Sequence, residues 1–245
     1  MYKYELHMHT SEGSACARNT GAEMVDFYAN MGYAGMVVTD HFYHGNTAPS
    51  RALPWREFIE AYAEGYRSAK KAAEGRDFDV FFGVEFRGIV GDEYLVYGLS
   101  PEWYMDHPEL RDTTGTDFLA VVREAGAFVI HAHPYRERAY MTRQTVLLVP
   151  SLVDAIEVRN YGNLPEEDRR ALEYARELGL PMTGGTDKHT IGSPKTPLCG
   201  ITLPFRCHTL EELSDAIRQK KHTVIGLEQI EDVPLTEPTF TVKRG

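Results

Sequence analysis

The chain has few cysteines, and they follow no recognisable pattern. Its three cysteines, Cys16, Cys199 and Cys207, are an odd number without C-x-x-C spacing. This argues against both a disulfide framework and a thiolate zinc site. The sequence also lacks an apolar run long enough to cross a membrane, and its first residues lack the apolar segment of a signal peptide. We therefore expect a cytoplasmic protein with reduced thiols and no membrane partner.

Positive charge is also scarce. The chain carries 26 Lys and Arg against 36 Asp and Glu, which gives a formal net charge of −10 at pH 7. This charge disfavours a long nucleic acid as partner, because a DNA-binding groove relies on cations, and it suits a small anionic substrate better. The length of 245 residues and the hydrophobic content of 42% are typical of one globular domain. We expect one domain over residues 1–245, with a helix and strand extension from about residue 198, and leave the oligomeric state open.

Apolar runs alternate with segments of helical period along most of the chain. We expect strands at 2–8, 35–39, 79–84, 94–99, 127–131, 154–158 and 181–184, and helices near 21–31, 55–74, 116–125 and 166–178. Such β–α repeats form an α/β fold with a parallel sheet, open or closed into a barrel, and ligands gather at the carboxyl ends of its strands. The long loops at 41–54 and 134–144 are interpreted as walls of a pocket.

The pattern changes beyond Pro197. After Ile201-Thr-Leu we expect a helix that begins at the capping box of Thr209 and runs to about Lys220, and then a short strand at 222–225. The tail at 234–245 contains two prolines and is either an edge strand or loose.

Histidines and carboxylates recur where the expected strands end. They are His7 and His9, Asp40 and His41, Glu85, His131 and His133, and Asp187 and His189. Alternation along an extended strand directs His7 and His9 to the same side. Imidazole and carboxylate ligands without thiolate suit zinc, manganese or iron. The series predicts a site for several metal ions, with Glu85 as the carboxylate that bridges two of them.

The order of these motifs resembles the polymerase and histidinol phosphatase (PHP) superfamily of metal-dependent phosphoesterases. The motifs are His-x-His-Thr, Val-Val-Thr-Asp-His, Gly-Val-Glu, Ala-His-Pro and Gly-Thr-Asp-x-His, and they lie between Glu5 and about Ile225. The resemblance implies a distorted (β/α)7 TIM-like barrel. It also implies two to three divalent ions, zinc, manganese or iron, at the C-terminal ends of the strands.

The resemblance assigns a ligand set to each ion. The first would take His7, His9, Glu85 and Asp187. The second would take Glu85, His133 and Glu93, which stands where the family usually has a histidine. The third would take His41, His189 and a residue soon after the His-x-His, an aspartate or histidine in relatives. We expect Glu12 to fill this last position, with Cys16 as the alternative; if neither reaches it, the third ion is weakly held or absent.

Other residues near the motifs are candidates for catalysis or substrate binding. Asp40 is interpreted as a residue that orients a ligand or carries a proton, beside the catalytic ligands Glu85 and Asp187. Contacts to a substrate phosphate are expected from Arg18, Arg136, Arg159 and Lys188. The resemblance adds Asn160 at the mouth of the pocket. His44 is a candidate pocket residue, and His131 is either a ligand, a support for the ligands or a core residue.

The function we expect is hydrolysis of a small phosphomonoester or nucleotide by a metal-activated hydroxide at a site with two or three ions. Histidinol phosphate is one substrate consistent with the resemblance, which indicates fold more firmly than substrate. Two alternatives are a 3′-5′ exonuclease-like nuclease, which requires a basic path for single-stranded DNA, and a non-catalytic metal-binding regulatory domain.

Overall fold

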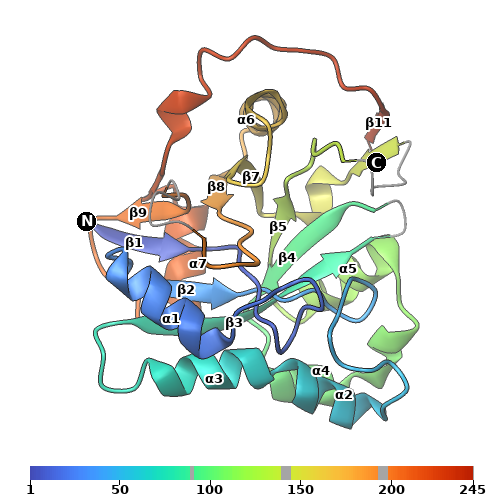
Figure 1. Cartoon of the computed structure of the whole chain (residues 1–245). Coiled ribbons are helices and arrows are strands. Elements are labelled where there is room, and N and C mark those ends of the chain that lie inside the picture. Colours follow the sequence, from blue (N-terminus) through green and yellow to red (C-terminus); the bar gives the residue numbers. More distant parts are fainter. Residues whose placement is uncertain (89–90, 139–144, 193–197, 245) are drawn as a thin grey trace.

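The main sheet curves into an almost closed barrel (Figure 1). The computed structural model describes residues 1–88, 91–138, 145–192 and 198–244. In these ranges the sheet has nine strands in the order β10-β9-β1-β2-β3-β4-β5-β7-β8. They are β1 (Tyr2–Glu5), β2 (Gly35–Val38), β3 (Asp79–Arg87), β4 (Glu93–Tyr97), β5 (Phe128–Ala132), β7 (Ala155–Asn160), β8 (Met182–Gly185), β9 (Ile201–Leu203) and β10 (Thr223–Val224).

The two edges of the sheet come together at β8. A side chain at Gly184 in β8 would meet the backbone oxygen of Gly200 and the side chain of Val224, each at 3.1 Å. The edges thus touch without a hydrogen-bonded ladder between them. The expected α/β barrel is confirmed, and the segment beyond residue 198 supplies two of its strands.

One strand runs against the expected parallel repeat. β4 pairs antiparallel with both β3 and β5, and no helix separates it from β3. The register sets Glu93 opposite Arg87 on one side and opposite Ala132 on the other. Because β4 is reversed, its first residue lies at the rim where its neighbours have their carboxyl ends. β9 also pairs antiparallel, with β1.

Seven α-helices occur in the described residues. They are α1 (Gly21–Asn30), α2 (Trp55–Tyr62), α3 (Glu64–Ala72), α4 (Pro101–Asp106), α5 (Gly115–Glu124), α6 (Pro165–Leu178) and α7 (Leu210–Arg218). The expected helix at 55–74 is divided at Ala63 into α2 and α3. Helix α4 was not expected from periodicity; it begins at the Ser100 cap, with Pro101 in its first turn.

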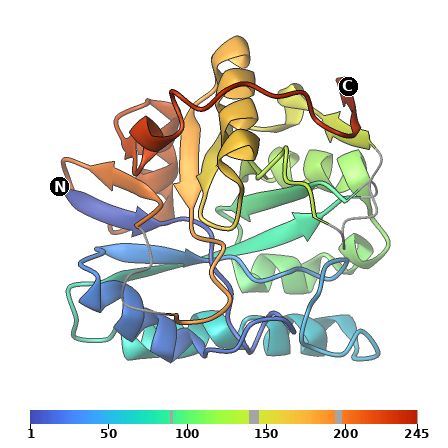
Figure 2. The ribbon, with the colours of Figure 1, turned by 45° about the horizontal axis from the view of Figure 1, so that its top comes forward.

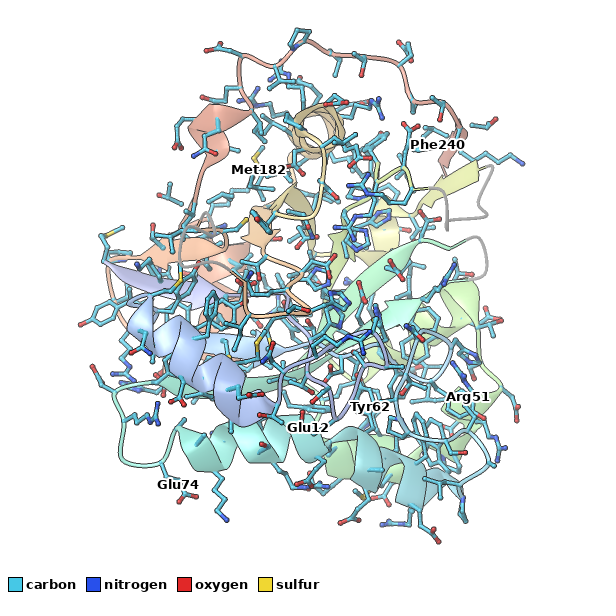
Figure 3. The ribbon with its side chains drawn as sticks, in the orientation of Figure 1. Glu12, Arg51, Tyr62, Glu74, Met182 and Phe240 are labelled. Carbon is cyan, nitrogen blue, oxygen red and sulfur yellow. The ribbon has the colours of Figure 1, made fainter. Side chains whose placement is uncertain are left out.

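The C-terminal segment passes over α6 and ends in a second, two-stranded sheet (Figures 1 and 2). There β11 (Thr241–Arg244) pairs in parallel with β6 (Thr145–Leu148). Arg170 of α6 donates from Nε to the backbone oxygen of Thr236 at 2.8 Å, and Phe240 (labelled in Figure 3) stacks on Tyr135. Residues 241–244 of the tail therefore form a strand, and Phe240 just before it packs against Tyr135 in the segment that follows His133.

Buried aromatic rings support the rim of the barrel. Phe86 of β3 lies parallel to Phe118 of α5, with ring centroids 3.8 Å apart, and Phe42 packs edge-on against Tyr62. All four rings are buried, so the backbone beside Glu85 and His41 rests on a packed core. Among the described residues no helix is long and apolar enough to span a membrane.

Candidate metal centre

The strand ends bring the predicted ligands into one connected group. The loops that follow β1 and β8 meet near the centre of the molecule (Figures 1 and 2), and Met8 pairs with Lys188 there. Four overlapping sets have ligand atoms within 4.8 Å of one another: His9, His41 and His189; His7, His9 and Glu85; His7, His133 and Glu157; and His41, Glu85 and Glu93. Shared members join the four sets, so the arrangement offers adjacent positions for more than one ion.

Glu85 lies at the centre of this group, and its two oxygens face different histidines. Oε1 is 3.1 Å from His7 Nε2 and 3.3 Å from His133 Nε2. Oε2 is 2.5 Å from His41 Nδ1 and 3.7 Å from His9 Nε2. Burial raises the pKa of Glu85, but the imidazoles of His41 and His7 outweigh burial and hold the pKa well below its usual value. A carboxylate so placed is suited to bridge two ions.

Asp187 and Glu93 add carboxylates on either side of Glu85. Asp187 Oδ1 is 3.0 Å from His9 Nε2, and its Oδ2 accepts a hydrogen bond from Arg136 at 2.5 Å. Glu93 Oε2 lies 3.5 Å from His133 Nε2. Burial and the charge of Glu85 raise the pKa of Glu93 to about 7. Glu93 is thus close to the group, at the position where the resemblance implies a histidine.

The donor set and an unsatisfied atom both fit metal binding. His7 Nε2 is fully buried and forms no hydrogen bond within the described residues, although Glu85 Oε1 is only 3.1 Å away. An unsatisfied buried nitrogen is costly, and an ion between the imidazole and the carboxylate would satisfy both. The residues present therefore suit divalent ions.

Two buried carboxylates that the sequence analysis missed hold the ligands in place. Glu157 Oε1 is 3.0 Å from His7 Nδ1, and its Oε2 accepts from the backbone N of His133 at 2.9 Å. Glu5 Oε1 accepts from the backbone N of His7 at 2.8 Å and of Thr186 at 2.9 Å. The position of Glu157 in an expected strand was the only sign of its role.

Asp40 supports His9 from behind the site. It accepts hydrogen bonds from Thr10 N and Oγ1, each at 2.6 Å, and from Ser14 Oγ at 2.7 Å. Ser14 Oγ lies 3.0 Å from His9 Nδ1. Burial raises the pKa of Asp40 to about 6. Asp40 does not line the cavity described below, so its position supports the orienting role and not direct proton transfer to a substrate.

The backbone is tightly constrained at the residues that carry or adjoin the proposed metal ligands. A side chain at Gly185 would meet His7 Cβ at 2.4 Å and Glu157 Oε1 at 2.7 Å. His133 and Asp187 have positive φ angles of 27° and 50°, which residues other than glycine rarely adopt. Such strained residues persist where the surrounding contacts fix them, often at functional sites.

A cavity of about 630 Å³ opens onto the group. It is lined by Cys16, His41, His44, Gly45, Asn46, Glu85, Arg87, Glu93, Arg136, Asp187 and His189. The loop at 41–54 therefore forms part of the wall, as expected. The other expected wall, at 134–144, lies partly outside the described residues. Arg87, at the end of β3, was not among the sequence candidates.

Of the five expected substrate contacts, only Arg136 lines the cavity. Arg159 instead pairs with Asp168 of α6 at 2.6 Å, because a β-bulge between Glu157 and Arg159 breaks the alternation and turns this side chain outward. Asn160 supports Arg136, whose Nη2 donates to Asn160 Oδ1 at 2.7 Å.

Lys188 and Arg18 also lie outside the cavity. The ammonium of Lys188 is 5.2 Å from the ring centre of Phe27 and 5.4 Å from that of Tyr161. Arg18 is exposed at the surface, although its backbone N donates to the oxygen of His189. Neither side chain reaches the place where a substrate would meet the ligands.

The loop after His9 places Glu12 and Cys16, the two candidates for the third ion, in different surroundings. Glu12 accepts a hydrogen bond from Gly21 N at the start of α1 and lies beside α2 and α3 (labelled in Figure 3). Cys16 lines the cavity with His41 and His189. Burial raises the pKa of its thiol, but hydrogen bonds with His189 and His41 outweigh burial and lower the pKa to about 6.

His131 belongs to the core and not to the ligand group. Its ring stacks on Tyr94 with centroids 4.7 Å apart, and it has no exposed surface. Asp92 Oδ1, at 3.7 Å, is too distant for a hydrogen bond to its Nε2. Its place on β5, one pleat below His133, explains why it does not join the ligand group.

Comparison with known proteins adds a sequence match and a fold. Residues 165–193 match a family model described as PHP-associated. A two-domain protein from Bacteroides vulgatus, which contains a predicted PHP-like metal-dependent phosphoesterase, has 17% identity and a TM-score of 0.69 over 91% of this chain. This chain spans 64% of that protein's length.

Two further structures have a similar fold. A protein from Bifidobacterium adolescentis, named as a metal-dependent phosphoesterase, has 16% identity and a TM-score of 0.57; the match covers 89% of this chain and 96% of that one. A lesion-specific endonuclease from Pyrococcus furiosus has 11% identity and a TM-score of 0.55, with coverage of 91% and 57%. No curated protein sequence matches the chain.

Proposed function

We propose that this chain is a member of the PHP superfamily and a metal-dependent phosphoesterase that hydrolyses a small phosphomonoester. The observation that carries the proposal is the position of Glu85, whose two oxygens face different histidines inside one connected ligand group. Such a pair of adjacent metal positions is suited to hold both the attacking and the leaving oxygen of a phosphoryl transfer.

The ions would supply a nucleophilic water at neutral pH and would neutralise charge on the phosphate oxygens. The protein's own residues do the positioning. His7, His9, Glu85, His133 and Asp187 are the proposed ligands at the centre, with Glu93 beside them. Glu157 orients the ring of His7. Ser14, which is hydrogen-bonded to Asp40, orients the ring of His9.

Arg136 fixes Asp187 and carries positive charge into the cavity wall. Its guanidinium contacts Asp187 Oδ2 at 2.5 Å, Asn163 Oδ1 at 2.7 Å and Asn160 Oδ1 at 2.7 Å. These bonds fix the plane of the guanidinium. Arg136 therefore acts as a positioning residue for a ligand, and it makes the cavity more favourable for an anion.

Arg87 is the proposed contact to the substrate phosphate. It lines the same cavity at the end of β3, next to Glu85 along the rim. No hydrogen bond or ion pair of its guanidinium is found among the described residues, in contrast to Arg136. A partly buried guanidinium that is unpaired within these residues is available to bind phosphate oxygens by charge-assisted hydrogen bonds.

Hydrolysis of aryl phosphates tests the proposal. Purified protein is depleted of metal, reconstituted with manganese or zinc, and assayed with an aryl phosphomonoester, an aryl phosphodiester and a short single-stranded oligonucleotide. We expect metal-dependent release of inorganic phosphate from the monoester, with loss of activity in Glu85→Ala but not in the exposed control Glu60→Ala. Preferential cleavage of the diester or oligonucleotide would favour the nuclease alternative. Metal binding without hydrolysis of any probe would favour a non-catalytic domain.

A further inference from the structure

Three imidazoles form the part of the ligand group with the least negative charge. The ligand atoms of His9, His41 and His189 lie within 4.8 Å of one another, and no carboxylate belongs to this set. The Nε2 atoms of His41 and His189 face each other at 3.4 Å. Glu85 Oε2 is 2.5 Å from His41 Nδ1 and Asp187 Oδ1 is 3.0 Å from His9 Nε2, but Glu85 belongs to two other sets and Asp187 accepts from Arg136. Three imidazoles leave a fourth position on a zinc ion, which water or a further side chain can fill.

Cys16 is held next to these imidazoles by the loops that carry them. It lines the same cavity, and its thiol lies within hydrogen-bonding reach of both His41 and His189. The backbone on either side is fixed, because Ala15 N donates to the oxygen of Asn46 at 2.9 Å and Arg18 N donates to the oxygen of His189 at 2.8 Å. The turn around Cys16 is therefore bonded to both ligand-bearing loops.

We infer that Cys16 supplies a thiolate ligand to an ion held by His9, His41 and His189. This inference rests on the proposed metal-dependent function and deepens it, because relatives are expected to use an aspartate or histidine here. A set of three imidazoles and one thiolate is a zinc site by ligand type, whereas the carboxylate-rich sets around Glu85 are compatible with manganese as well. The site then binds zinc selectively at one of its positions.

The other two cysteines provide matched controls. Cys199 and Cys207 are both buried, and neither belongs to the ligand group. Cys199 donates from its thiol to the backbone oxygen of Arg159. Cys207 packs in a cluster with Leu203 and Leu213. A change confined to Cys16 can thus be separated from a general effect of removing a thiol.

Cobalt substitution gives a spectroscopic test that does not depend on activity. Metal-free protein is titrated with Co²⁺, and the near-ultraviolet band of thiolate-to-cobalt charge transfer is recorded for wild type, Cys16→Ser and Cys207→Ser. We expect the band in wild type and Cys207→Ser and its loss in Cys16→Ser, with one zinc ion fewer per chain by elemental analysis. Cobalt binding to wild type without the band, or a band that persists in Cys16→Ser, would overturn the inference.

Alkylation of wild-type protein keeps the inference testable if Cys16→Ser fails to fold. Iodoacetamide should modify Cys16 in metal-free protein, and saturating zinc should protect it, with Cys199 and Cys207 as unreactive internal references. Modification of Cys16 at the same rate with and without zinc would contradict a thiolate ligand. The variant Cys16→Asp should bind zinc more weakly relative to manganese, because the thiolate is replaced by an oxygen ligand.

The two proposals can fail separately. Charge transfer from Cys16 in a protein that hydrolyses no phosphate ester would retain the thiolate ligand and reject the phosphoesterase. Metal-dependent hydrolysis by a protein whose cobalt form lacks the band would retain the phosphoesterase and reject the thiolate ligand.

Discussion

His7 Nδ1 lies 3.0 Å from Glu157 Oε1, and both side chains are buried. The carboxylate thus fixes the ring of a proposed ligand so that Nε2 points toward Glu85. The same residue accepts from the backbone of His133, so it orients ligands on β1 and on the loop after β5. We expect Glu157→Gln to weaken metal binding by about 10–100-fold, the usual loss when such a support is removed.

Metal titration of the apo protein measures this effect. Glu173→Gln is the control, because Glu173 lies on the surface of α6 and forms ion pairs only with Arg169 and Arg176 among the described residues. Equal metal affinity in the Glu157 variant and wild type would show that the contact does not support the site.

Arg87→Ala should raise KM for a phosphomonoester about 10–100-fold, the equivalent of one or two charge-assisted hydrogen bonds. Metal content should not change, because Arg87 forms no hydrogen bond or ion pair with a proposed ligand among the described residues, although Glu93 lies opposite it in the register of β3 and β4. Steady-state kinetics and elemental analysis check both parts. The control is Arg18→Ala, which changes an exposed arginine outside the cavity. If both variants behave like wild type, Arg87 does not bind the phosphate.

Glu93→His should retain full metal occupancy, because it restores the ligand that relatives are expected to carry at this position. Glu93→Ala should lower the occupancy of one ion, since Glu93 Oε2 lies 3.5 Å from His133 Nε2 and no side chain would replace it. Elemental analysis after dialysis distinguishes the variants. Unchanged occupancy in Glu93→Ala would remove Glu93 from the ligand set.

Phe118→Ala should lower the free energy of unfolding by about 3–5 kcal/mol, the range for truncation of a buried phenylalanine. Its ring stacks on Phe86, directly beside Glu85 in β3, so loss of stability should be accompanied by weaker metal binding. Denaturant unfolding of the metal-free protein gives the value. Phe205→Ala is the control, because Phe205 is 40% exposed and should change stability by less than about 0.5 kcal/mol.

Alkaline pH should unfold the protein before its buried tyrosines ionise. Burial raises the pKa of Tyr28, Tyr62 and Tyr97 well above 10, and raises that of Tyr4 to about 12. Above pH 10 the unfolded chain loses these protons while the folded protein keeps them. The free energy of unfolding therefore falls with rising pH, by about 1.4 kcal/mol per pH unit for each such tyrosine.

Phenolate absorbance and circular dichroism, followed together in an alkaline titration, check this order of events. The absorbance of the buried tyrosines should rise in the same transition in which secondary structure is lost. Complete ionisation of all tyrosines in a protein with an intact dichroism spectrum would contradict their burial.

The position of the candidate site could be predicted from sequence because its ligands follow buried strands directly. Alternation placed His7 and His9 on one side, and the shared rim of the sheet brought Glu85, His133 and Asp187 to them. The reversed direction of β4 could not be read from strand propensity, since a β-branched and aromatic run has the same composition in either direction.

The positions of two other expected residues depend on tertiary contacts. Arg159 was expected to contact the substrate because it lies near the strand-end motifs, whereas the register shift between Glu157 and Arg159 accompanies a side chain that pairs with Asp168. Glu12 was expected to fill the position where the resemblance implies an aspartate or histidine, with Cys16 as the alternative; the hydrogen bonds of Ala15 and Arg18 hold Cys16 beside the loops of His41 and His189. Neither a bulge nor a loop path has a local sequence signal strong enough to predict it.

Gly185 sets how closely β8 approaches His7 at the site. With only a hydrogen atom at this position, β8 lies close enough to β1 for Asp187 to reach the two histidines, and even a methyl group would fall 2.4 Å from His7 Cβ. In a library in which every codon is randomised and selected for metal retention, codon 185 should therefore return glycine alone. Exposed positions of α6 should accept many residues in the same selection. Restriction to glycine at codon 185, which carries no ligand, would show that metal retention depends on the spacing of β1 and β8 as well as on the ligand side chains.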